Sequence, residues 1–242
     1  GRMGKNLWTS DEQGAPIRLY AAFNERDEAD FVVDRIRQHV RGGGRRSEVA
    51  VLYRSNAQSR VFEEAFLNAG IPYRVYGGLR FFERAEIKDA LAYLRLTVNR
   101  DDDASFERIV NVPARGIGAR TMEILREYAR ANACSLWRAA GACLSQEVVL
   151  QAKAAGALRA FLALIERLAG EIRNLDLYEQ VDCIIQRSGL IEHFSKDNND
   201  RNEARVENLQ ELVSAARTFT VEPESELAPL DEFLAHAALE AG

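Results

Sequence analysis

The sequence predicts two parts, a partial parallel α/β sheet in residues 1–78 and a larger all-helical domain in residues 79–242. In the first part, short apolar segments alternate with amphipathic ones in the order β-α-β-α-β, which is typical of a parallel sheet. From Phe81 onward, apolar residues recur only at helical spacing. We expect a hinge at the glycine pair Gly77 and Gly78, between the two parts.

Three segments of the first part are predicted strands: residues 17–23, 48–53 and 71–76. The second is a nearly continuous apolar run, which is typical of a strand buried on both faces. Helices are expected between them, with Asn24 or Asp27 as the cap of the first.

In the second part, the sequence predicts a series of helices separated by polar turns. A turn of three aspartates, residues 101–103, provides an N-cap for the helix that follows it. The expected helices cover residues 81–96, 105–110, 121–130, 136–143, 148–172, 177–188, 203–219 and 230–240.

The overall composition excludes several classes of protein. A net charge of −5 means that any nucleic-acid contact must come from a local patch. The three cysteines form no C-x-x-C pair and the three histidines share no ligand spacing, so we expect reduced thiols, a cytoplasmic protein and no metal site. No apolar run is long enough to span a bilayer, so no membrane partner is expected.

Residues 110–121 form the most distinctive segment, a Gly-Ile-Gly turn between two predicted helices. Gly116 and Gly118 permit positive φ and close approach of a partner to the backbone. The first N–H groups of the following helix lack intrahelical partners and favour an anion. Arg115 adds a cation and Thr121 a hydroxyl. The segment resembles a helix-hairpin-helix that holds DNA phosphates; the alternative is an ordinary helix C-cap followed by a tight turn.

A second polar segment follows the predicted buried strand. Ligands of open α/β sheets bind beyond the carboxyl ends of the strands. Arg54 and Asn56 there offer a cation and amide groups that suit a phosphodiester strand. The alternative is a loop that only caps the next helix.

A third segment, residues 79–89, combines aromatic and basic residues. Arg84 and Lys88 are four residues apart and share a helix face. Phe81 and Phe82 could stack on bases, but we favour a core role because aromatic side chains bury the largest apolar area.

Catalytic motifs are absent from the sequence. We find no Gly-x-x-x-x-Gly-Lys-Ser/Thr P-loop, no Walker-type acidic strand and no nucleophile elbow. The residues themselves therefore predict a binding or accessory module.

Three strings carry a family resemblance: Tyr-Arg-Ser-Asn-Ala-Gln-Ser-Arg at residues 53–60, Phe-Phe-Glu-Arg-Ala-Glu-Ile-Lys-Asp at 81–89, and Asn-Val-Pro-Ala-Arg-Gly-Ile-Gly at 111–118. The chain resembles the UvrD/PcrA/Rep group of superfamily I DNA helicases over essentially its whole length. The resemblance implies part of the second RecA-like motor domain, 2A, in residues 1–78 and most of the inserted domain 2B in residues 79–242.

The family's activity and sites follow from the same resemblance. Its members use ATP and magnesium to move 3′-to-5′ along single-stranded DNA and to unwind duplex DNA in repair. Arg54 and Asn56 match positions that contact the single strand. Gly116, Gly118 and Thr121 match the duplex-phosphate hairpin, and Lys88 matches a basic position near the duplex. Arg95 and Arg115 are assigned as DNA contacts on chemistry and neighbourhood alone.

The chain also departs from the family pattern. Nothing matches the P-loop, the Asp-Glu magnesium motif or the arginines that touch the γ-phosphate, so we expect a piece of a longer protein with no catalytic residue and no bound ATP or magnesium. Sequence-independent DNA is the expected partner, with DNA-repair proteins as further candidates. The alternative is a non-enzymatic interaction or autoregulatory module of a repair protein.

Overall fold

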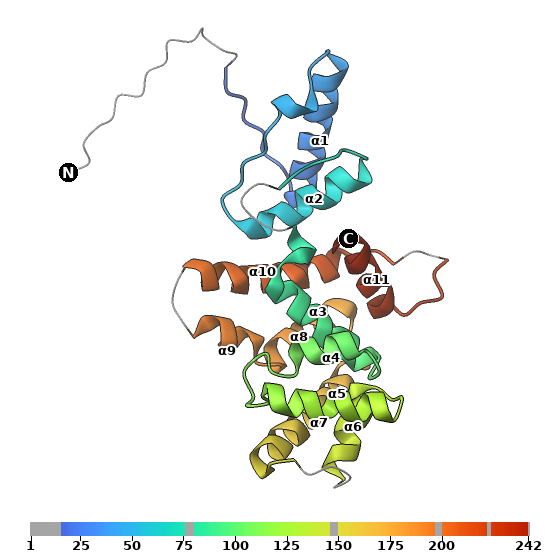
Figure 1. Ribbon diagram of the computed structural model, residues 1–242. Helices are drawn as coiled ribbons and strands as arrows, with labels where there is room; N and C mark the ends of the chain where they lie inside the picture. The colour runs from blue at the N-terminus through green and yellow to red at the C-terminus, as the bar shows by residue number, and fades with distance from the viewer. Residues whose placement is uncertain (1–15, 76–79, 146–149, 197–199, 222–223, 242) are drawn as a thin grey trace, which may run out of the picture.

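A computed structural model describes residues 16–75, 80–145, 150–196, 200–221 and 224–241 (Figure 1). All regular secondary structure in these ranges is helical. Three 3₁₀ helices are Arg46–Glu48 (η1), Asn56–Gln58 (η2) and Phe81–Glu83 (η3). The α-helices are Glu25–Arg41 (α1), Ser59–Asn68 (α2), Ala85–Val98 (α3), Asp103–Ile109 (α4), Ala119–Ala131 (α5), Leu136–Leu144 (α6), Ala152–Ile172 (α7), Leu177–Arg187 (α8), Leu190–Ser195 (α9), Asp200–Thr218 (α10) and Pro229–Ala241 (α11).

The predicted parallel sheet is wrong: among the described residues, none of the three expected segments is a strand. Residues 17–23 are exposed throughout, and Leu52, expected to be buried, is 94% exposed. A strand needs hydrogen bonds from a neighbouring strand, and these segments form no ladder with one another where they are described. The hinge predicted at Gly77 and Gly78 lies outside the described residues.

The apolar side chains of two of these segments instead pack on a pair of helices. Val33 and Ile36 of α1 meet Phe66 of α2 and Ile71 in a small buried cluster. Asn24 caps α1, since its Oδ1 accepts a hydrogen bond from the Asp27 amide at 2.9 Å. Figure 1 shows α1 and α2 as a layer at the N-terminal end, above α10.

A second, larger core joins the helices from η3 to α11. Its centre is α3, whose Ile87, Tyr93, Leu94 and Leu96 have no exposed surface. This helix contacts α4, α7, α8, α10 and α11, which explains why its apolar residues occupy several faces. Figure 1 shows α3 running through the middle of the molecule, with α5, α6 and α7 at the end opposite to α1.

The helix predictions of the second part are confirmed to within a few residues at most ends. Asp102 caps α4 as expected, because its Oδ1 accepts from the Ser105 amide at 3.0 Å. Helix α9 was not predicted; it begins after Gly189, whose φ of 85° breaks the helical path from α8. Residues 146–149 are not described, and α7 begins at Ala152.

The side of α11 that faces the body carries an unusual carboxyl group. Glu240 has a buried Oε1 atom without a hydrogen-bond partner, 3.3 Å from Nε2 of His236. A small cavity there is lined by both residues together with Arg60 and Glu64. Burial, with repulsion from Glu64 and then Glu63, raises the pKa of Glu240 to about 7.

We predict that this carboxyl makes the stability of the protein depend on pH between about 4.5 and about 7. Because the folded pKa lies above the ordinary value of 4.5, the stabilising contribution is complete below that value and is lost as the pH rises through about 7. Melting temperatures should fall as the pH rises from about 4.5 to about 7 and then level off, and they should fall less steeply for Glu240→Gln.

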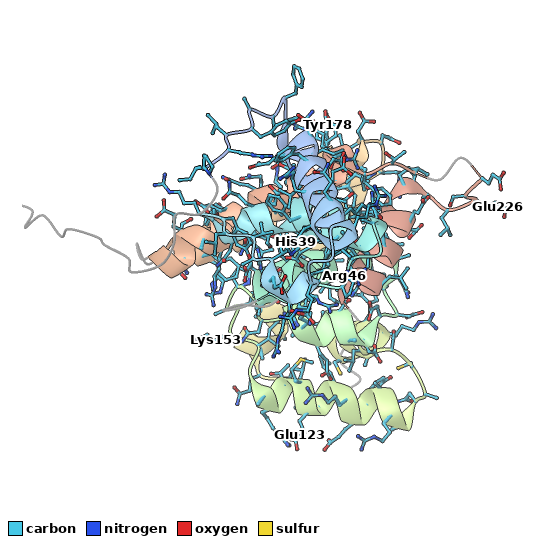
Figure 2. The ribbon with its side chains drawn as sticks, turned by 90° about the horizontal axis from the view of Figure 1, so that it is seen from above. His39, Arg46, Glu123, Lys153, Tyr178 and Glu226 are labelled. Carbon is cyan, nitrogen blue, oxygen red and sulfur yellow. The ribbon has the colours of Figure 1, made fainter. Side chains whose placement is uncertain are left out.

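Glu226→Gln is the matched control, since Figure 2 shows Glu226 projecting away from the body of the molecule. The control should keep the wild-type pH slope. Identical slopes for Glu240→Gln and wild type would contradict the prediction.

Candidate nucleic-acid interface

The Gly-Ile-Gly turn joins α4 to α5 and is anchored from inside. Ile117 lies in the large core with only 2% of its surface exposed. Asn111 Oδ1 accepts from the amide of Arg115 at 2.7 Å and from that of Ile117 at 3.4 Å. The buried Ile117 and the two bonds to Asn111 therefore hold the turn in place.

The Arg115 side chain is used inside the protein. Its guanidinium donates to the carbonyls of Ile109 at 3.0 Å, Pro113 at 3.1 Å and Ser188 at 3.2 Å, and also to the Tyr93 hydroxyl. Tyr93 in turn donates to the Val112 carbonyl at 2.6 Å. These bonds tie the turn to α3 and α8. A direct DNA contact of Arg115 stays a prediction, and the structure gives this residue a role in holding the turn.

The first backbone amides of α5 are unpaired among the described residues. The first intrahelical bond runs from Met122 N to Gly118 O at 3.2 Å. The N–H groups of the preceding residues, from Gly118 to Thr121, find no acceptor among the described residues. Unpaired amides at a helix start carry partial positive charge and favour an anion.

The two glycines of the turn differ. Gly116 has φ of +80°, as the sequence suggested, whereas Gly118 has an extended backbone with φ −84° and ψ 174°. A Cβ added to Gly118 would meet no atom within 4 Å. Neither backbone conformation nor packing within the described chain therefore requires glycine at position 118.

The remaining predicted DNA contacts, and Arg120 beside the turn, vary in accessibility. Thr121 is 8% exposed, so its side chain is mostly covered. Arg120 is exposed but pairs with Glu123 at 2.7 Å, and Figure 2 shows Glu123 at the outer edge of the molecule. Lys88 and Arg95 are partly exposed on α3, and neither side chain has a partner in the described ranges. The positive charge around the turn is thus modest.

Arg54 and Asn56 lie apart from the turn, in the segment that leads into α2. Both are exposed and without a side-chain partner among the described residues. Gln58 Oε1 accepts from the amides of Arg54 and Ser55, both at 3.1 Å, so the segment folds as a capping box. Ser55 and Gln58 thus act as the caps that the alternative prediction expected. The side chains of Arg54 and Asn56 take no part in the capping.

A groove of about 720 Å³ separates this segment from α10. Residues 54–58 line one wall, and α10 lines the other with Glu203, Glu207, Gln210 and Glu211. The groove therefore brings two neutral amides and a guanidinium to face several carboxylates. The sequence did not predict the role of α10 here, because the two walls are about 150 residues apart and no local pattern links them.

Other sequence predictions concern residues outside these two surfaces. Phe81 and Phe82 are almost completely buried, which confirms the core role. All three cysteines are free thiols. In the described ranges, no three His, Cys, Asp or Glu side chains gather around a possible metal position, and no helix has the length and apolar character needed to cross a bilayer.

Residues 1–242 match the UvrD-like helicase C-terminal domain. The chain belongs to this family. It is 54% identical over its whole length to DNA helicase II of Escherichia coli, of which it covers 34%. It is 39% identical over 96% of its length to the ATP-dependent DNA helicase PcrA of Staphylococcus aureus, of which it covers 31%.

These relatives confirm the resemblance found in the sequence. The UvrD-like chain spans about a third of the length of the curated relatives it matches. Their names describe DNA helicases, and for PcrA an ATP-dependent one. The individual DNA contacts remain predictions.

The two glycines of the turn provide a stability test. Gly116→Ala should destabilise the protein by about 1–2 kcal/mol, because an L side chain is strained at positive φ. Gly118→Ala should change stability by no more than about 0.5 kcal/mol, since its backbone is extended and its surroundings are open. Urea unfolding of both variants measures the difference; equal losses would contradict the assignment.

Proposed function

We propose that this chain is the DNA-binding portion of an ATP-dependent DNA helicase that moves 3′-to-5′ and acts in DNA repair. Residues 79–242 hold duplex DNA, and residues 1–78 contact the single strand. The observation that carries the proposal is the row of unpaired amides at the start of α5 beside Gly118. Membership of the UvrD-like helicase family supports it.

The turn is suited to a phosphate of either strand. Free N–H groups from Gly118 onward point to an anion-binding helix start, and the missing Cβ lets a phosphate approach the backbone. Such contacts involve no base edge, so binding is independent of sequence. Lys88 and Arg95 on α3 add cations, and Arg115 holds the turn in shape.

The single-strand contact uses Arg54 and Asn56. A guanidinium pairs with phosphate oxygens, and an amide can bind a phosphate or a base edge. The two residues are exposed side by side on a segment whose backbone is held by Gln58.

Chemistry is supplied by other parts of the parent protein. ATP and magnesium are its cofactors, and the sequence of this chain carries no P-loop. The isolated chain therefore neither hydrolyses ATP nor unwinds DNA.

We predict that Gly118→Val combined with Thr121→Ala weakens duplex binding. The added side chain blocks the phosphate, and the lost hydroxyl removes a donor. Fluorescence anisotropy with a labelled duplex should show a loss of about tenfold, equivalent to one charge-assisted contact. Gly156→Val is the control, because this glycine is also exposed with open space around it but lies on α7. If the double variant bound the duplex as tightly as wild type, the assignment of the turn as a duplex contact would be wrong.

Arg54→Ala with Asn56→Ala should reduce single-strand binding while leaving duplex binding at the turn unchanged. With about 3–5 phosphate contacts, log K for duplex should fall with log salt at a slope of about −2.7 to −4.5, and affinity should be micromolar or weaker at physiological salt. A salt series with both nucleic acids measures this. A protein partner retained after DNase treatment, with no salt-dependent DNA binding, would favour the interaction-module alternative.

A further inference from the structure

The segment that carries Arg54 and Asn56 is held to α10 at two points. The Ser55 hydroxyl donates to Glu207 Oε2 at 2.5 Å, and Nε of Arg60 lies 2.5 Å from Glu211 Oε1. Glu207 and Glu211 are four residues apart, so they lie on the same face of α10 one turn from each other. Because the two bonds lie one helical turn apart, they fix both the position of the segment on α10 and its direction along that helix.

Side-chain directions along the segment follow from this attachment. Ser55 is half-buried toward α10, whereas Arg54 and Asn56 on either side of it are exposed. Ser55 Oγ also accepts from the Ala57 amide at 3.4 Å, which starts η2. The inward bond of Ser55 thus orients both of its neighbours at the mouth of the groove.

The attachment is unexpected on electrostatic grounds. A site for a polyanion is weakened by carboxylates close to it, because like charges repel over several ångströms. Arg60, only 5% exposed, already has Glu64 at 2.8 Å and Glu25 at 3.9 Å, so it does not need Glu211 for neutralisation. Burial raises the pKa of Glu211 despite Arg60, which shows that placing this carboxyl there has a cost.

We propose that Glu207 and Glu211 of α10 are positioning residues for single-stranded DNA, which act by holding Ser55 and Arg60 so that Arg54 and Asn56 are arranged for the strand. The inference rests on the proposed single-strand contact. Holding the backbone of the segment in place before binding removes part of the entropy cost of ordering it on the strand.

Glu203 supplies a matched control within the same groove. It lies one turn before Glu207 on α10, lines the groove and is exposed, and it has no partner among the described residues. Removing it changes the charge of the groove without releasing the segment.

The test compares Glu207→Ala, Glu211→Ala and Glu203→Ala in the full chain. A labelled thymidine oligomer of about 16 nucleotides and a labelled duplex are titrated by anisotropy. Positioning predicts a loss of about three- to tenfold in single-strand affinity for the first two variants. The loss of a negative charge alone would instead raise the affinity for the strand. Glu203→Ala, which loses only the charge, should therefore bind the oligomer as tightly as wild type or more tightly.

Two further measurements separate positioning from damage to the fold. Duplex binding at the turn should stay at the wild-type level in all three variants. Glu207→Gln, which keeps an oxygen acceptor for Ser55, should recover the single-strand affinity that Glu207→Ala loses.

The outcomes distinguish the inference from the proposed function. If Arg54→Ala weakens single-strand binding while Glu207→Ala and Glu211→Ala bind as tightly as Glu203→Ala or wild type, the positioning role is overturned and the contact stands. If the wild-type chain does not bind the oligomer, or Arg54→Ala has no effect, the proposed contact itself fails. A matching loss of duplex affinity would also count against positioning.

Discussion

The buried guanidinium of Arg84 is the constraint on which the arrangement of this molecule depends. It is 8% exposed and donates to Ser59 Oγ at 2.7 Å and to Asn208 Oδ1 at 2.8 Å. Asn208 in turn donates to Glu86 Oε1 at 2.5 Å. Burial lowers the pKa of Arg84, but an arginine stays charged, so its donors must find acceptors. Losing one partner of a buried charge costs about 3–5 kcal/mol, far more than a surface pair contributes.

This requirement brings together three helices that are distant in the chain. Ser59 begins α2, Arg84 precedes α3, and Asn208 lies in α10. The exposed ion pairs elsewhere, such as Arg120 with Glu123, contribute about 0–1 kcal/mol each and do not determine the arrangement. The hydrogen bonds of Arg84 to Ser59 and Asn208 therefore place the segment before α2 against α10. The groove between them follows from that placement.

The turn before α5 shows a different balance of forces. Its shape is held by the buried Ile117 and by the internal bonds of Arg115, while the first backbone amides of α5 have no acceptor in the part of the chain that the structure describes. Arg115 and Arg120 beside it are paired within the protein, so an anion placed at this helix start would meet mainly the fixed dipoles of the backbone.

The sequence by itself determined where most helices lie and which family the chain belongs to, because helical periodicity, caps such as Asp102 and specific strings are local properties. It also identified Gly116 as a turn residue and Phe81 and Phe82 as core. Only the tertiary structure decided what depends on distant partners. The expected strands are not formed, since the apolar run 48–53 cannot supply its own neighbouring strands. Arg115 is hydrogen-bonded inside the protein, Thr121 is covered, Gly118 is open and Arg54 lines the groove beside α10. Each of these properties depends on what the rest of the chain places beside the residue.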